Sequence, residues 1–113
     1  MERIAPYRTV VKKILQQKAD VMRNGAQADI ETMLTFDEAR DHYLLLRMGW
    51  TRDGRIFVPT LCARIHNGKI WIENDWTDEG LATSLLEHGV PADDVVLAFH
   101  PPDMRVHTEF AVA

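Results

Sequence analysis

The side chains that act as nucleophiles in enzymes are few in this chain of 113 residues. Ser84 is the only serine, and no Gly-x-Ser-x-Gly turn surrounds it. Cys62, the only cysteine, precedes His66 by four residues in a predicted strand, which separates the two by about 13 Å. That separation is too long for a nucleophile and its base. We therefore expect no nucleophile–base pair here, and we expect Cys62 to be a thiol of the core.

Metal-binding and acid–base residues are also scattered. The histidines show neither His-x-x-x-His spacing nor a Cys-x-x-Cys companion, and no glycine-rich phosphate loop is present. The densest carboxylate group, Asp37, Glu38 and Asp41, falls in a predicted turn, where solvated side chains are the common case. The histidines are His42, His66, His88, His100 and His107. The sequence therefore predicts no catalytic residue, no metal and no cofactor.

Charge is distributed unevenly along the chain. The net charge is −4, yet residues 1–25 hold six basic and two acidic side chains. An acidic protein is a poor general binder of nucleic-acid phosphates. The basic first segment leaves one alternative open, in which Arg8, Lys12 and Lys13 contact DNA phosphates directly. The other interpretation is a solvated helix face.

The spacing of apolar residues predicts which elements hold these side chains. Apolar residues recur every three or four positions from Arg3 to Met22, which predicts an amphipathic helix that ends at Asn24 and Gly25. Alternating or strand-like runs then follow. The runs predict four antiparallel strands in a meander, over 30–36, 42–48, 55–65 and 69–74. The turns are expected at 37–41, at Asp53-Gly54 and at Asn67-Gly68.

The remaining third of the chain predicts a second helix, a strand and a tail. Thr77 is expected to cap the second helix, with Asp78 and Glu79 in its first turn, and Gly89 to end it. Residues 95–99 predict a buried fifth strand. The apolar tail 110–113 is expected to pack on the body or on a second subunit. The fold class is α+β, with residues 1–113 as a single domain.

The chain has three tryptophans, a residue enriched where proteins bury an apolar face against a partner. Two of them, Trp50 and Trp76, favour contact with a partner. Trp71 is expected in the core, because Ile70 and Ile72 bracket it. Because Trp50, Trp76 and the apolar tail could be buried between two copies of the chain, a homodimer is an alternative that the sequence leaves open. The lone cysteine and the absence of a membrane-length apolar run predict a cytoplasmic protein.

Several short blocks follow one another in a fixed order along the chain: Tyr7-Arg8, residues 40–43, Gly49-Trp50, residues 68–72, residues 89–91, residues 96–100 and residues 108–113. In this order they resemble the XisI-like family of cyanobacterial excision-controlling factors. Three positions depart from the family pattern. Cys62 and Arg64 stand where the third strand often has His-x-Asp, and Trp76 stands where glycine is common.

The resemblance implies a small non-catalytic accessory protein of programmed DNA element excision. Such a protein is expected to act beside a site-specific recombinase and an XisH-like companion, which resembles an endonuclease fold and is the expected partner. In a variant of this hypothesis, the chain inhibits that companion. We expect the partner to contact strand and tail residues, because arginine and aromatic side chains favour such contacts. These candidates are Arg40, Asp41, His42, Tyr43, Trp50, His100, Arg105, Glu109 and Phe110.

Overall fold

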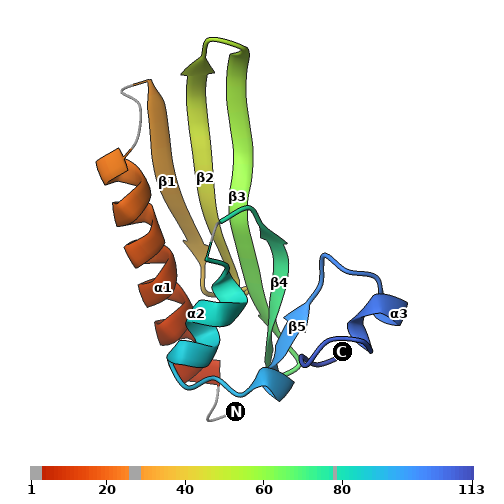
Figure 1. The fold of residues 1–113 in the computed structure, drawn as a ribbon. Coiled ribbons are helices and arrows are strands. Elements are labelled where there is room, and N and C mark those ends of the chain that lie inside the picture. Colours follow the sequence, from red (N-terminus) through yellow and green to blue (C-terminus); the bar gives the residue numbers. More distant parts are fainter. Residues whose placement is uncertain (1–3, 26–28, 78) are drawn as a thin grey trace.

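The computed structural model describes residues 4–25, 29–77 and 79–113, arranged as one five-stranded sheet with helices (Figure 1). The predicted α+β order is confirmed, with β5 shorter than expected and two short helical segments added near the end. Within the described residues, no helix is long and apolar enough to cross a membrane. The elements are α1 (Ile4–Gly25), β1 (Ile30–Asp37), β2 (His42–Thr51), β3 (Gly54–His66), β4 (Lys69–Asp75), α2 (Leu81–Glu87), η1 (Ala92–Asp94), β5 (Val95–Leu97) and α3 (Pro102–Arg105).

The sheet follows chain order, β1-β2-β3-β4-β5. The first four strands form the predicted antiparallel meander, and β5 pairs with β4 in parallel because α2 and η1 carry the chain back across the sheet. The two dipeptide turns are confirmed: Gly54 and Gly68 have positive φ, and Asn67 adopts φ 53°. Next to Pro59 the β2–β3 register shifts, so the proline lies at a β-bulge.

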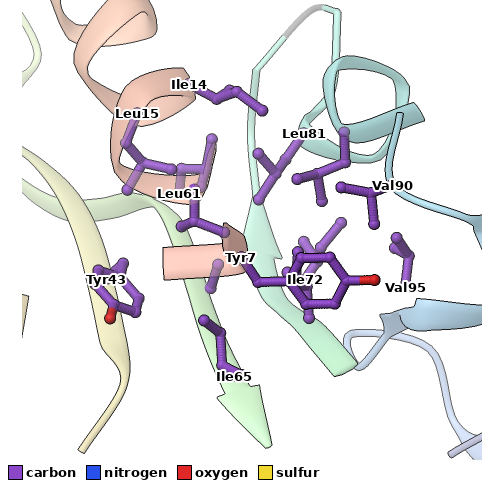
Figure 2. Packing of buried hydrophobic residues seen from close by; sticks show 14 of the residues in the cluster. Tyr7, Ile14, Leu15, Tyr43, Leu61, Ile65, Ile72, Leu81, Val90 and Val95 are labelled. Carbon is purple, nitrogen blue, oxygen red and sulfur yellow. The ribbon is translucent and has the colours of Figure 1, made fainter. Parts of the chain in front are cut away.

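The core lies between the sheet and the two longer helices (Figure 2). From α1, Val11, Ile14 and Leu15 are fully buried, as expected for positions that share one helical face. They pack against alternate residues of β2, β3 and β4 and against Leu81 and Leu85 of α2. The hydroxyl group of Tyr7 donates a hydrogen bond to the carboxylate of Asp94, which ties the start of α1 to the end of η1.

The start of α2 differs from the prediction. The helix begins at Leu81, and Thr77 does not cap it. The carboxylate of Asp75 takes this role instead, since one oxygen accepts the Leu81 N–H at 2.6 Å and the other accepts the Thr77 N–H at 2.9 Å. Gly80 precedes the helix with φ 82°. Asp78 lies outside the described residues, so its predicted place in the first turn is not described.

The end of α2 agrees with the prediction. Gly89 has φ 88°, and the N–H of Val90 donates to the Leu85 carbonyl, a glycine-terminated helix end. His88 Nδ1 lies 2.8 Å from the Ser84 carbonyl oxygen, so this histidine has a structural contact. At the other helix, Gly25 is the last described residue of α1 and is helical, and the expected helix end there borders residues 26–28, which lie outside the described residues.

The tail packs on the body of the same chain. Ala111 forms a parallel bridge with Val96, and its N–H donates to the Val95 carbonyl at 2.9 Å. Lys69 Nζ donates to the Ala113 carbonyl oxygen at 2.5 Å. Of the two placements predicted for the tail, packing on the body is confirmed.

At the far end of the sheet, the start of β1 approaches β2 closely. Gly49 lies opposite Ile30 in the register and has φ 151°. The N–H of Trp50 donates to the Asp29 carbonyl at 3.2 Å. A Cβ at Gly49 would lie only 1.9 Å from that carbonyl oxygen, so a glycine is required here.

Candidate functional site

The two faces of the sheet have different surroundings. α1 and α2 pack on one face, and no described helix covers the β1–β3 part of the other, which we call the open face (Figure 1). Side chains alternate between the faces, so Tyr43 and Leu45 are buried under the helices, while Leu44 and Leu46 point to the open face. The open face is therefore the largest part of the sheet available for contact.

One end of the open face carries a cluster of two arginines and a tryptophan. The guanidinium carbons of Arg64 and Arg105 lie 5.3 and 5.5 Å from the centroid of the Trp71 ring. Arg64 also forms an ion pair of 2.7 Å with Glu73. Cation–π contacts of this kind hold flat, half-exposed groups in place. We call Arg64, Trp71 and Arg105 the arginine–tryptophan cluster.

The position of Trp71 contradicts the prediction that it belongs to the core. Ile70 and Ile72 are buried under the helices, so the residue between them must face the other way. Its indole N–H donates to the His66 carbonyl at 3.0 Å. The prediction for Cys62 was also wrong, because this residue is half-buried on the open face beside Leu44 and not among the core residues. Burial still raises the pKa of its thiol.

The predicted contact residues of β2 separate onto two faces. His42 is exposed and lies in register with Arg64, so it borders the arginine–tryptophan cluster. Trp50 is 61% exposed at the opposite end of the open face, where Arg55 lies over its ring at 5.7 Å. Tyr43 is buried on the helix side, so it offers no contact surface.

Asp41 and Tyr43 instead belong to an internal network with α1. The two carboxylate oxygens of Asp41 accept from Arg8 at 2.6 and 3.1 Å, and one of them also accepts from the Tyr43 hydroxyl at 2.8 Å. The Arg8 hydrogen bond lowers the pKa of Asp41. Burial, with help from Asp41, raises the pKa of Tyr43. The network fixes α1 to the β1–β2 turn.

The basic residues of α1 are largely paired. Arg8 is bound to Asp41, and Lys12 Nζ lies 2.7 Å from Glu38. Lys13 is exposed and has no ion pair within the described residues. The carboxylates of the 37–41 turn therefore neutralise two of the three cations that direct DNA contact would use.

The remaining predicted contact residues, Arg40 and those that follow β5, have mixed roles. Arg105 holds the tail, because its guanidinium donates to the carbonyls of His100 at 2.8 Å and Val112 at 3.1 Å. Phe110 is half-buried against the core, and Glu109 is exposed. Arg40 is exposed and bound to Asp37, whose pKa it lowers. The His100 ring packs on Phe99 at 4.5 Å.

A groove of about 610 Å³ lies between α1 and α2 and was not predicted from the sequence. Arg47 is at its floor, with Nε buried and without a hydrogen-bond partner among the described residues, and Trp76 is at its rim, 77% exposed. Lys18 and Glu87 also line it, so both signs of charge are present. The groove therefore does not select a single ligand chemistry. Across 4–25, 29–77 and 79–113, no group of three metal-binding side chains occurs.

Comparisons with known proteins agree on one family. The family model described as XisI protein matches residues 1–112. A crystal structure of a XisI-like protein from Anabaena variabilis is 34% identical, with a TM-score of 0.89 over 97% of this chain and 99% of that one. The fdxN element excision controlling factor XisI from the same organism is 36% identical, with a TM-score of 0.82 over 98% and 99%. No curated protein matches significantly. The chain therefore belongs to the XisI family.

Proposed function

We propose that this chain is a non-catalytic accessory protein of DNA element excision, which acts by binding an endonuclease-fold partner of the XisH-like type. The name of the Anabaena relative, an element excision controlling factor, supports the excision role. The observation that carries protein binding is the arginine–tryptophan cluster, which presents a half-buried indole and two guanidiniums from β3, β4 and α3. Tryptophan and arginine dominate the energetic centres of protein interfaces.

The surroundings of the cluster suit a protein partner better than DNA. Arg64 is ion-paired with Glu73, and Arg105 keeps its charge but directs three of its N–H groups to backbone carbonyls of its own chain, which leaves fewer donors for a phosphate. The exposed His42 lies in register with Arg64 and adds a further polar group beside the cluster. A hot spot ringed by mixed polar groups is the usual anatomy of a protein–protein contact.

Binding can be tested with an XisH-like protein from the same organism. Trp71→Ala should weaken the complex about 30-fold, the equivalent of a 2 kcal/mol hot spot, in isothermal titration calorimetry. Trp76→Ala is the matched control, because it removes the same side chain from the helix side of the molecule. An unchanged melting temperature must accompany each variant. Equal loss in both variants, or no complex for the unmodified chain at micromolar concentration, contradicts the proposal.

The alternatives make different predictions. An inhibitor would use the same cluster and abolish nuclease activity of the companion, whereas an accessory factor would preserve or redirect that activity. Direct DNA binding through Lys13 and its neighbours would show affinity that falls steeply with salt. We expect no such binding, because Asp41 and Glu38 neutralise Arg8 and Lys12.

A further inference from the structure

The middle of the open face is an uncharged apolar strip. In the register, Met33, Leu46 and Pro59 lie side by side on β1, β2 and β3. The row on one side is Thr35, Leu44 and Cys62, and on the other side Met48 pairs with Phe57. Phe57 is 62% exposed and Met33 41%. We call Met33, Leu44, Leu46, Met48 and Phe57 the apolar strip.

The strip has the layout of an interface. Charged side chains lie at its borders, with Glu31 on the β1 edge, Arg55 at one end and the Arg64–Glu73 pair at the other. An apolar centre with a polar rim is how protein interfaces are built. Contiguous exposed apolar patches rimmed by polar residues mark contact sites.

The molecule is more extended and exposes more surface than a typical compact domain of its length. Its Cα radius of gyration is 14.5 Å, where about 13.3 Å is usual for a domain of this length. Its accessible surface is 6968 Å², against about 6,300 Å² for a compact monomer of 13.0 kDa. The excess of about 600 Å² approaches the roughly 800 Å² that each partner buries in a stable interface. In Figure 1 the β2–β3 hairpin extends beyond both helices, which lengthens the molecule.

We propose that the apolar strip is the interface of a homodimer, in which the open faces of two copies pack against each other about a two-fold axis. Such an interface brings identical surfaces together, so the strip must not repel itself. Its three rows carry no charge except Glu31 at the edge. Of the charged groups at its two ends, Arg64 and Glu73 are paired with each other, and Arg55 lies over the Trp50 ring. A different protein would be selected by complementary charge, which the strip does not offer.

Dimerisation through the edge strands of the sheet is disfavoured, so the open face is the surface through which two copies would pair. At the β1 edge, the Arg23 guanidinium donates to the Thr32 carbonyl at 2.9 Å and covers it. The part of β3 beyond β4 carries Pro59, which has no N–H to donate. At the opposite edge of the sheet, Ala111 of the tail pairs with Val96 of β5 and covers the edge of that strand there. Two sheets that pack face to face at about 10 Å bury alternate residues of both, as the strip requires.

The test is the mass of the full chain in solution, by light scattering and sedimentation equilibrium. We expect about 26 kDa, twice the 13.0 kDa of the chain, at micromolar concentration. Leu46→Asp, at the centre of the strip, should raise the dimer dissociation constant at least about 100-fold, because it buries an unpaired charge. Phe57→Ser removes an exposed side chain and should weaken the dimer while the fold is kept.

Val21→Asp is the matched control, since Val21 is 73% exposed on α1, away from the strip, and gains the same charge. It should remain dimeric. A wild-type chain that stays at 13.0 kDa up to about 100 µM overturns the proposal. So does an assembly that persists unchanged in both strip variants. The outcome is independent of partner binding, because Trp71→Ala lies outside the strip and should leave the dimer intact.

Discussion

Gly49 offers the sharpest test of how β1 and β2 fit together. In Gly49→Ala the new methyl carbon would lie 1.9 Å from the Asp29 carbonyl oxygen and 2.9 Å from Ile30 Cα. Both neighbours are backbone atoms, so no side chain can rotate away. The start of β1 must shift by about 1.5 Å to restore van der Waals contact, with loss of the Trp50–Asp29 hydrogen bond.

The cost of Gly49→Ala has two parts. A non-glycine residue at φ 151° costs about 1–3 kcal/mol in backbone strain. Overpacking against a fixed backbone adds about 1–3 kcal/mol. The total, about 2–6 kcal/mol, is a large fraction of the 5–15 kcal/mol that is typical for a domain's free energy of unfolding.

Gly54→Ala separates the two parts. Gly54 has φ 128°, but nothing lies within 4 Å of a Cβ built there, so this variant carries strain without the clash. Urea unfolding followed by circular dichroism should place Gly49→Ala about 1–3 kcal/mol below Gly54→Ala. Equal stability of the two variants would refute the close approach of β1 to Gly49.

Three further predictions concern the capping carboxylate, the α1 network and the tail. Asp75→Ala should lower the free energy of unfolding by about 1 kcal/mol, because Leu81 loses its cap, while Thr77→Ala should cost less; the reverse order in urea unfolding would restore Thr77 as the cap. Because the pKa of Asp41 is lower in the folded than in the unfolded chain, its ionised form stabilises the fold above about pH 4, and this stabilisation is lost as the pH falls through the folded pKa. Asp41→Asn should therefore be less stable at pH 7 and differ less from wild type at pH 3, and a constant difference between the two pH values would contradict the network. Arg105→Met should speed hydrogen exchange of the Ala111 amide by at least about tenfold, since the tail loses its guanidinium contacts, and unchanged protection would show that the Val95 bond alone holds it.

The order of elements could be predicted from the sequence because local signals agree with one another. Asn67-Gly68 needs positive φ, and the apolar spacing before Gly25 has a helical period. Such patterns depend on residues close in the chain. They predicted the antiparallel meander and the end of α2 at Gly89.

What could not be predicted is which partner a side chain meets across the fold. Alternation in β4 assigns Trp71 and Ile72 to opposite faces, but only tertiary structure shows that the helices cover the isoleucine side. Thr77 has the preferred residue type for a cap, and Asp75 displaces it because its carboxylate reaches two N–H groups. The pairing of Arg8 with Asp41 spans 33 residues and leaves no local signal.

The bond between Tyr7 and Asp94 joins residues 87 positions apart, and this has a consequence for synthesis of the protein. The first helix leaves the ribosome early, yet its buried face packs on Leu81, Leu85 and Val95, which are made near the end. At translation rates of about 5–20 residues per second, the apolar face of α1 waits several seconds for its partners. The nascent chain can pair β1, β2 and β3 in the meantime, and it closes its core only when β5 has emerged.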